Sequence, residues 1–278
     1  MTKGQKVGYF FLGLLPLPIA IALQNLLMIP LGGISFALIL VNGGVTEPSG
    51  EALFDMVLSQ TFLEIVEVVY ASAAVVLFGF WLYKVFRKEH GPLLRRERRF
   101  LLLLLGLLLL CVGGQFLAEV VYDIVGMFSP ATAQNYEKLI ELAGFDEPSV
   151  LTLVYGVLIG PIAEELIFRG VMMHYLRRSL PFAAANVIQA VLFGVYHMNL
   201  MQGIYTAVIG LLFGYICYRG GSILYSILAH MMFNFLGFTN LLYLGSDSPY
   251  YEFFWLPVMI LALILGSMLF FRKSPETS

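Results

Sequence analysis

Three charged side chains stand within one of the most apolar stretches of the chain, the segment GPIAEELIFRG at residues 160–170. They are Glu164, Glu165 and Arg169. A charge at the centre of a membrane helix costs roughly 2.5–3.5 kcal/mol on insertion scales, so such residues usually serve a function. Glu165 and Arg169 are four residues apart with the glutamate first, which is the favourable order for an ion pair on a helix. This spacing predicts that these two charges offset each other.

Glu164 has no comparable partner on its own helix. Its helical face carries only apolar neighbours, namely Gly160, Pro161, Phe168 and Val171. Proline cannot donate a backbone hydrogen bond and glycine has no side chain, so this face can open a cavity beside the carboxylate. We therefore expect the partner of Glu164 to come from another helix.

Two later apolar segments carry polar side chains that could reach this cavity. The stretch FGVYHMN, residues 193–199, places His197 four residues after Phe193. The stretch HMMFN, residues 230–234, places His230 and Asn234 one turn apart, so both project to the same side of a helix. We expect the three polar segments to converge on one cavity.

These residue types indicate a hydrolytic site. A carboxylate beside a neutral imidazole can hold a water molecule and accept its proton, so we expect Glu164 and His197 to act on water. An imidazole and a side-chain amide can donate hydrogen bonds to the oxyanion of a tetrahedral intermediate, which predicts that role for His230 and Asn234. Together the four side chains describe the attack of water on an amide.

Three motifs follow one another along the chain: Glu164-Glu165-x-x-x-Arg169, Phe193-x-x-x-His197 and His230-x-x-x-Asn234. In this order on membrane helices they resemble the CPBP family, which contains the type II CAAX prenyl proteases and the related bacteriocin-processing, or Abi, proteins. The resemblance covers about residues 150–240, where it predicts a CPBP-like catalytic core.

The resemblance implies an intramembrane endopeptidase of the CAAX-protease-like glutamic type. It implies that Glu164 and His197 activate the water, while His230 and Asn234 stabilise the oxyanion. The resemblance implies that the remaining motif residues, Glu165, Arg169 and Phe193, give the site structural support.

Members of that family have also been described as metalloproteases. A zinc ion here would be bound by Glu164, His197 and His230, since one carboxylate and two imidazoles can ligate zinc. We favour a mechanism without zinc or any other cofactor, because the chain has no HExxH pair and Asn234 is a poor zinc ligand.

The composition is that of a polytopic membrane protein. The chain of 278 residues is 59% hydrophobic and 12% charged, against roughly 25% charged residues in an ordinary soluble domain. Its net charge of -2 lacks the basic excess that contacts with nucleic-acid phosphates require, so no nucleic-acid partner is expected. Cys111 and Cys217 lie in apolar runs and are expected to be small core residues.

Apolar stretches of about 20 residues predict an all-α bundle of about eight transmembrane helices. The expected spans are 8–30, 53–82, 100–126, 150–174, 181–198, 201–218, 222–244 and 253–271. Residues 31–41 are too short to cross alone, so they either continue the first helix or form a re-entrant piece. No stretch is polar enough for a separate soluble domain, so residues 1–278 are expected to form a single integral membrane domain.

The basic residues predict the orientation of this bundle. Lysine and arginine are enriched in cytoplasmic loops. With the N-terminus inside, fourteen of the sixteen basic residues fall at cytoplasmic ends, and the outside loops are acidic. We therefore expect both termini in the cytoplasm. Counted from these basic ends at about 1.5 Å per residue, His197 would lie several Å nearer the outside than Glu164 and His230, unless its helix is tilted or starts deeper after Pro181.

Two other classes of function stay open. Acidic groups elsewhere at membrane depth, as in a proton relay, are compatible with a proton-coupled transporter; they are Glu64, Glu67, Glu119 and Asp123. A non-catalytic membrane scaffold is the second alternative. The expected partners are the lipid bilayer and a membrane-associated or lipid-modified protein or peptide substrate: a prenylated tail, a leader peptide or a sorting tail. The expected location is a bacterial or archaeal cell membrane.

Overall fold

The computed structural model describes residues 1–43, 59–86, 100–142, 148–239 and 251–271. Within these ranges all regular structure is helical, so the predicted all-α fold class is confirmed. The N-terminal half contains α1 (Lys3–Leu14), α2 (Pro16–Gly43), α4 (Gln60–Phe86), α5 (Phe100–Phe128) and α6 (Pro130–Leu142). The C-terminal half contains one long composite helix over residues 150–179, followed by α10 (Phe182–Tyr196), α11 (Leu200–Gly220), α12 (Ile223–Thr239) and α13 (Tyr251–Phe270).

Each of the eight expected spans corresponds to an apolar helix. Five helices of the described residues are long and apolar enough to cross a membrane: Lys3–Ile34, Gln60–Val85, Leu101–Phe128, Val150–Ser179 and Leu200–Gly220. Three further apolar helices are shorter: Phe182–Tyr196, Ile223–Thr239 and Phe254–Phe270. These helices define a polytopic membrane bundle, and the exact number of crossings stays a prediction.

The structure resolves one open helix limit and adds one helix that the sequence did not predict. Helix α2 continues through Pro30 to Gly43, so residues 31–41 extend the first apolar helix. The polar helix α6 was not predicted, because a search for apolar runs does not detect it. The predicted residues 53–58 and 240–244 lie outside the described residues.

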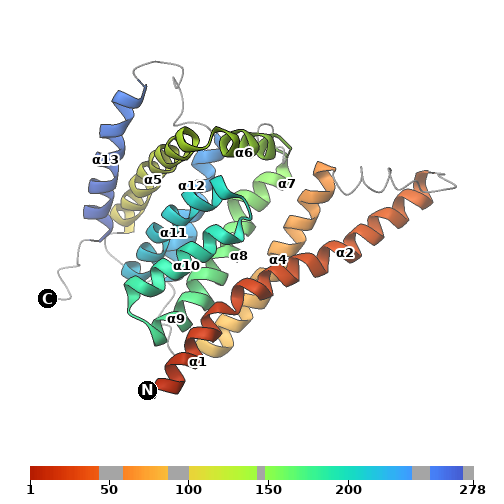
Figure 1. The fold of residues 1–278 in the computed structure, drawn as a ribbon, viewed down its shortest axis with the longest axis horizontal. Coiled ribbons are helices and arrows are strands. Elements are labelled where there is room, and N and C mark those ends of the chain that lie inside the picture. The colour runs from red at the N-terminus through yellow and green to blue at the C-terminus, as the bar shows by residue number, and fades with distance from the viewer. Residues whose placement is uncertain (44–58, 87–99, 143–147, 240–250, 272–278) are drawn as a thin grey trace.

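Two apolar clusters flank the middle of the bundle. One is built from α4 and the composite helix, with Tyr70, Phe78, Phe168 and Leu176 among its fully buried members. The other joins α5, α11, α12 and α13. Figure 1 shows α13 on one side of the bundle, α2 and α4 on the other, and α8, α10, α11 and α12 between them. The polar residues of the three motifs therefore lie on the central helices.

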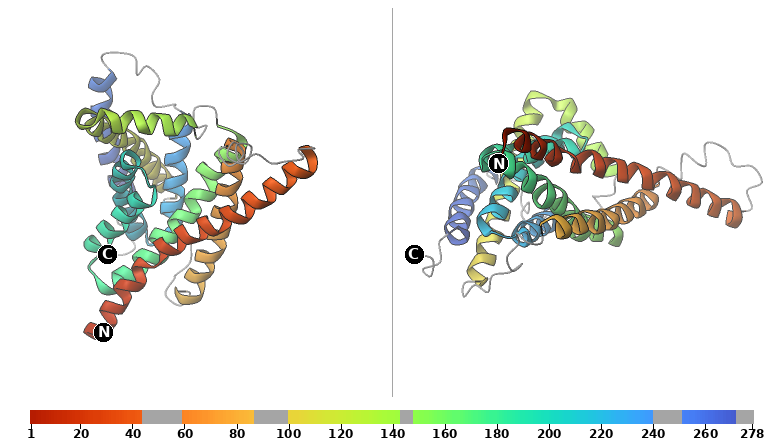
Figure 2. Two further views of the ribbon diagram at one scale, coloured as in Figure 1. Left: turned by 45° about the vertical axis from the view of Figure 1, so that its right-hand side comes forward. Right: turned by 90° about the horizontal axis from the view of Figure 1, so that it is seen from below.

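Helix α2 extends beyond the rest of the bundle, as both views in Figure 2 show. Most of its exposed side chains are apolar, including Leu26 and Ile29, which are 66% and 75% exposed, and the exposed Asn25 returns its amide to the carbonyl of Ile21. This is the pattern of a helix face that meets lipid rather than water.

Helices α10 and α11 approach each other closely through glycines. A Cβ at Gly194 would collide with the carbonyl oxygen of Gly203. Gly210 and Gly214 form a GxxxG motif on α11, and the side chain of Asn186 occupies the space beside Gly214. Small residues at such interfaces let membrane helices pack backbone to backbone. This packing fixes α10, and with it the end of α10 that carries His197, against α11.

The basic ends of several helices meet at one end of the bundle. The guanidinium of Arg178, at the end of α9 (Met173–Ser179), lies 5.0 Å from the ring centre of Tyr9 on α1. The guanidinium of Arg177 lies 4.6 Å from the ring centre of Tyr218, near the end of α11. The ring of Phe271, just after α13, is 4.7 Å from that of Tyr215 on α11. The first helix therefore starts at the end of the bundle where the last helix finishes.

Candidate active site

The two glutamates lie in a short α-helical segment between two π-helices. The composite helix consists of α7 (Val150–Leu153), η1 (Val154–Ile159), α8 (Gly160–Glu165), η2 (Leu166–Met172) and α9. π-helical turns are rare, well under about 1% of residues, and they often mark functional sites. The segment GPIAEELIFRG thus contains both a charge anomaly and a backbone anomaly.

Pro161 explains where the first π-helix ends. The backbone N–H of Gly160 donates to the carbonyl of Tyr155, five residues back. The next bond of this pattern would run from residue 161 to the carbonyl of Gly156, but proline has no N–H. The carbonyl of Gly156 is therefore left without its helical partner, and the side-chain amide of Asn234 donates to it at 2.7 Å. This bond ties α12 to the start of the glutamate segment.

The predicted ion pair is present. The Nη1 atom of Arg169 donates to Oε1 of Glu165 at 2.8 Å, and both side chains are buried. The Nη2 atom of Arg169 donates to the carbonyl of Gly210 at 3.1 Å. The guanidinium also lies 4.5 Å from the ring centre of Phe193 and 5.6 Å from that of Phe213. A carboxylate, a carbonyl and two aromatic faces together compensate for the burial of this cation.

His230 bridges the two glutamates. Its Nδ1 atom is 3.0 Å from Oε1 of Glu165, and its Nε2 atom is 3.6 Å from Oε2 of Glu164. Because the Glu165 carboxylate is paired with Arg169 and can only accept, Nδ1 of His230 carries the hydrogen of this bond. The partner of Glu164 thus comes from another helix, as the apolar face of its own helix predicted.

His197 lies at the end of its helix rather than inside it. Helix α10 ends at Tyr196, and His197 caps it. Its Nδ1 atom is 2.8 Å from the carbonyl oxygen of Phe193, which can only accept, so Nδ1 is protonated and Nε2 keeps its lone pair. The structure of the described residues shows no direct hydrogen bond between His197 and Glu164, although both line the same cavity. The α10 helix starts at Phe182, directly after Pro181, and its 15 residues bring His197 to the cavity despite the depth difference counted from the sequence.

Phe193 organises the surroundings of both histidines. Its buried ring meets His197 edge to face with centres 4.8 Å apart and His230 with centres 5.9 Å apart. It also contacts Phe168, one turn after Glu164, at 5.1 Å. The interpretation of Phe193 as structural support therefore has a clear geometric basis.

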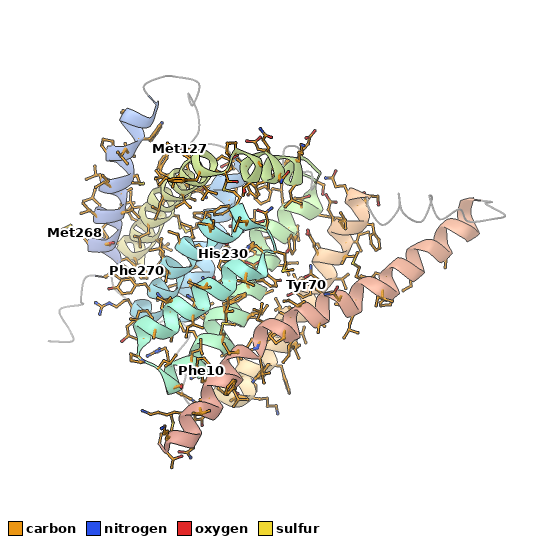
Figure 3. All side chains as sticks on the ribbon, viewed as in Figure 1. Phe10, Tyr70, Met127, His230, Met268 and Phe270 are labelled. Atoms are coloured by element: carbon orange, nitrogen blue, oxygen red, sulfur yellow. The ribbon has the colours of Figure 1, made fainter. Side chains whose placement is uncertain are left out.

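A cavity of about 680 Å³ contains the four residues with predicted chemical roles. Glu164, His197, His230 and Asn234 all line it, and Phe193 also contributes to its wall. Glu165 and Arg169 do not line it and lie behind the wall. In Figure 3 His230 lies in the centre of the bundle, and Met127, Met268 and Phe10 lie at its periphery. The three sequence motifs thus meet at one buried site.

Helix α6 contributes to the wall of the cavity away from the glutamates. The hydroxyl oxygens of Tyr136 on α6 and Tyr205 on α11 are 2.9 Å apart. Burial raises the pKa of Tyr136 above its ordinary value, so this phenol stays neutral and keeps its hydrogen bond. The hydroxyl of Tyr122 on α5 donates to Glu137 of α6 at 2.7 Å. These bonds hold α6 beside the cavity.

The sequence patterns missed several residues around the site. Tyr155 and Tyr196 line the cavity, and Tyr196 directly precedes His197 in the motif FGVYHMN. Gln115 lines it too, and its amide donates to the carbonyl of Phe233 on α12. In the sequence, these three residues could have been recognised as polar side chains within apolar helices. Their hydrogen-bond partners and their place in the cavity wall are known only from the three-dimensional structure.

The acidic residues that favoured a transporter have different environments. Glu64 is buried and accepts hydrogen bonds from Thr152 at 2.7 Å and from Gln60 at 3.0 Å, so it links α4 to α7. Glu67 and Glu119 line the cavity, whereas Asp123 is exposed near the end of α5. Glu64 therefore has a structural explanation, and Glu67 and Glu119 belong to the same cavity as Glu164.

The two histidines around the cavity share one feature with zinc ligands. Each imidazole gives Nδ1 to a protein acceptor and keeps Nε2 for the cavity, which is an arrangement that zinc ligands also use. However, no three side chains of His, Cys, Asp or Glu among the described residues are placed to hold a metal ion together. Glu164, His197 and His230 are thus not arranged as a set of zinc ligands here, and a mechanism without a metal stays a prediction.

Fold and site together define a polytopic helical membrane protein with a buried carboxylate and imidazole centre. Residues 146–236 match the model of the family described as type II CAAX prenyl endopeptidase Rce1-like. This match confirms, over that segment, the resemblance to the type II CAAX prenyl proteases that the three motifs predicted.

A curated protein also matches this chain, over a segment of similar length. The protein YdiL of Bacillus subtilis (strain 168), named as a candidate membrane peptidase, is 32% identical over 84 residues. The match covers 30% of this chain and 34% of YdiL, so the chain spans about a third of the curated relative it matches. No solved structure matches the chain.

Proposed function

We propose that the protein is an intramembrane endopeptidase that hydrolyses a peptide bond of a membrane-associated or lipid-modified protein or peptide. The observation that carries this proposal is the convergence of Glu164, His197, His230 and Asn234 on one cavity at the centre of the bundle. The family match of residues 146–236 and the name of the matching Bacillus protein support it.

In the proposed reaction, a water molecule binds between Glu164 and the free Nε2 of His197. Glu164 accepts one proton from this water, and the resulting hydroxide attacks the carbonyl carbon of the scissile bond. The C–N bond then breaks, and Glu164 returns its proton to the leaving amine. A positioned acid or base of this kind contributes roughly 10² to 10⁴ in rate.

The oxyanion of the intermediate is stabilised by Asn234 and His230 in this proposal. The amide of Asn234 uses one hydrogen for the Gly156 carbonyl and has a second hydrogen for the oxyanion. His230 has committed Nδ1–H to Glu165, so it can donate through Nε2 only when the ring is doubly protonated. The carboxylates of Glu164 and Glu165 on either side favour that cation.

The charges of the site balance in this state. Glu164 and Glu165 carry two negative charges, and His230 and Arg169 carry two positive charges. A balanced set of buried ions is far less costly at membrane depth than an excess charge. A doubly protonated His230 in the proposed reaction would therefore leave no excess charge among these four side chains.

Three substrate classes remain candidates: prenylated CAAX tails, leader peptides and C-terminal sorting tails. Each has a segment near the membrane that could enter a cavity of about 680 Å³. We propose a bacterial or archaeal cell membrane as the location, and the two substrate forms in the following test separate prenylated from unmodified peptides.

The proposal can be tested with the purified full chain in lipid nanodiscs. The probe is a library of internally quenched decapeptides, each prepared with a farnesylated and with an unmodified cysteine near its C-terminus. We expect cleavage by the wild type and a loss of at least about 10²-fold in kcat for Glu164→Gln, because a general base is removed. The matched control is His174→Gln on the same composite helix, since His174 does not line the cavity.

The result also separates the rival functions. Equal activity of the wild type and Glu164→Gln would contradict the protease, and solute transport that survives in Glu164→Gln would favour a transporter. A scaffold predicts that cell-based function survives both Glu164→Ala and His197→Ala. Stoichiometric zinc with cleavage that is sensitive to a chelator would contradict the metal-free mechanism.

A further inference from the structure

Tyr70 and Tyr196 form a hydrogen-bonded pair beside the candidate active site. Their hydroxyl oxygens are 2.7 Å apart. Tyr196 is the last residue of α10 and directly precedes His197, whereas Tyr70 belongs to α4, outside the segment that matches the peptidase family. In Figure 3 Tyr70 lies on the α4 side of the bundle, and His230 lies in its centre. The pair thus connects an N-terminal helix to the end of α10 that carries His197.

The number of hydrogens decides how this pair is oriented. Two phenols that share one hydrogen bond use one O–H, and the other O–H is left over. Tyr70 is 1% exposed, and its hydroxyl has no other partner among the described residues. If its hydrogen were the one left over, a buried donor would be unsatisfied and would bear its full desolvation penalty.

Tyr196 has the opposite environment. It is half-buried and lines the cavity, so its left-over hydrogen can meet water or substrate. The favoured arrangement is therefore that Tyr70 donates to the oxygen of Tyr196, and that Tyr196 directs its own O–H into the cavity. Its ring is held in place by edge contacts with Phe168 and His197, with centres 5.6 Å and 5.8 Å apart.

The O–H of Tyr196 in the cavity suits a backbone carbonyl of the substrate as its acceptor. A peptide must be unwound for its backbone to reach Glu164, and an unwound carbonyl at membrane depth needs a hydrogen-bond donor from the protein. Tyr196 stands next to His197 on α10, whereas the proposed oxyanion donors, His230 and Asn234, line the cavity from α12. It is placed for a carbonyl of the substrate backbone other than the one that reacts.

We infer that Tyr196 is a substrate-binding residue that donates its O–H to a backbone carbonyl of an unwound peptide next to the scissile bond, and that Tyr70 is its positioning residue. This inference rests on the proposed function. It assigns α4, which lies outside the matched segment, a part in substrate binding. It also predicts that the enzyme selects peptides able to unwind near the cleavage point.

The test uses the full chain in nanodiscs and the quenched decapeptide that the wild type cleaves fastest. A bond made equally in the bound substrate and the transition state changes KM and not kcat. We therefore expect Tyr196→Phe to raise KM by about 3- to 10-fold, as for the loss of one neutral hydrogen bond, with kcat within about 2-fold of wild type. Tyr70→Phe should raise KM by a smaller factor, and the double variant should match Tyr196→Phe alone, because both changes act through one hydroxyl.

The control is Tyr175→Phe. Tyr175 accepts a hydrogen bond from Trp81 of α4 at 3.3 Å, so this variant also removes a phenol that links α4 to the core, but away from the cavity. Its KM and kcat should stay at the wild-type values. Thermal unfolding of all variants verifies that each is folded. The double variant removes both hydroxyls of the pair, so its kinetics are free of any effect from a buried hydroxyl that has lost its acceptor.

Two results would overturn the inference while leaving the protease in place. One is an unchanged KM in Tyr196→Phe when Glu164→Gln is inactive. The other is a Tyr70→Phe effect of the same size in the presence and absence of the Tyr196 hydroxyl, which would make Tyr70 merely structural. A wild-type chain that cleaves no decapeptide would instead contradict the proposed function itself, and this inference with it.

Discussion

His230 gives the two neighbouring glutamates different chemistry. Glu165 accepts from both Arg169 and His230 through one oxygen and is enclosed by protein, so it is fixed as a carboxylate. Glu164 contacts only the far nitrogen of the same ring, at 3.6 Å, and its face is open to the cavity. The proposed base is thus the glutamate with the looser contact, whereas the two tight contacts hold the carboxylate of Glu165 in place.

Asn234 offers a sharp test at the level of a single residue. Asn234→Ala should lower kcat by about 10² to 10³, because one oxyanion donor is lost. Asn234→Asp should be worse than Ala, because its carboxylate cannot donate to the Gly156 carbonyl and also places a negative charge near the oxyanion. Steady-state kinetics on the quenched peptide measure the order, and equal kcat in Ala and Asp would contradict the oxyanion role.

The buried ion pair makes a prediction about stability. Arg169→Met leaves the Glu165 carboxylate buried with His230 as its remaining partner, so the free energy of unfolding should fall by about 3–5 kcal/mol. Replacing both residues, as in Glu165→Leu with Arg169→Met, should recover most of this loss. The control, Arg178→Met at the end of the bundle, should cost about 1 kcal/mol or less. Chemical denaturation in detergent measures the three values, and equal losses in both single variants would contradict the buried-pair account.

At the scale of helices, the site depends on a defect in a backbone. Pro161 prevents a hydrogen bond to the carbonyl of Gly156, and Asn234 of α12 uses the free carbonyl. Two further contacts hold α12 from the other side, since Cys111 of α5 donates to the carbonyl of Ala229 at 3.2 Å and Gln115 donates to that of Phe233. The helix that carries both proposed oxyanion donors is thus fixed by its neighbours.

Pro161→Ala tests this arrangement. The new N–H at residue 161 can donate to the carbonyl of Gly156, where it competes with the amide of Asn234. We expect kcat to fall by about 10-fold, part of the effect of losing an oxyanion donor, while the helix becomes no less stable because a proline is removed from its interior.

The matched control is Pro257→Ala, since Pro257 also lies inside a membrane helix, α13, but does not line the cavity. Kinetics and thermal unfolding are measured on both variants. If the two alanine variants had the same kcat as the wild type, the link from Pro161 to the oxyanion site would be wrong.

The sequence predicted the parts of the site that depend on local spacing. The pair of Glu165 and Arg169 follows from four residues on one helix, and the need of Glu164 for a partner follows from its apolar neighbours. The bridge from His230 to both glutamates depends on how α12 packs against α8, which no local pattern encodes. The π-helices were missed for a related reason, because hydropathy does not distinguish them from an α-helix.

The same limit applies to the elements. Apolar runs located the membrane helices, since burial in lipid requires length and low charge. They missed α6, whose polar sequence has no such signal although Tyr136 contributes to the cavity. They also placed His197 within a helix, whereas the structure ends α10 one residue earlier.

At the scale of the whole molecule, the N-terminal helices and the matched segment form one structure around the cavity. Gln24 of α2, Glu67 of α4 and Gln115 of α5 line it, although all three precede the segment that matches the family. The family segment supplies the proposed reactive groups, and the preceding helices supply part of the wall. In the proposed reaction, helices outside the matched segment therefore also contact the space that the substrate would enter.

The arrangement of the helix ends predicts the orientation of this molecule in the membrane. The start of α1 and the ends of α9, α11 and α13 lie together, joined by the contacts of Arg178 with Tyr9 and of Phe271 with Tyr215. A chain that starts and finishes at one end of the bundle crosses an even number of times. Since that end carries the basic residues, we expect it to face the cytoplasm.

Cysteine labelling of intact cells tests this orientation. Met127 lies at the far end of α5 and is 82% exposed, whereas Lys6 is an exposed residue of α1 at the basic end. A membrane-impermeant maleimide should label Met127→Cys in intact cells and Lys6→Cys only after lysis, and a fluorescent protein fused to the C-terminus should fold and fluoresce in the cytoplasm. Buried Cys111 should stay unlabelled, and a variant with Cys217→Ser removes the other native thiol. Labelling of Lys6→Cys in intact cells would show that the bundle has the opposite orientation. A C-terminal fusion that does not fluoresce, together with a Lys6→Cys that is labelled only after lysis, would place the two termini on opposite sides of the membrane. That result would contradict the contacts that bring the start of α1 and the end of α13 to the same end of the bundle.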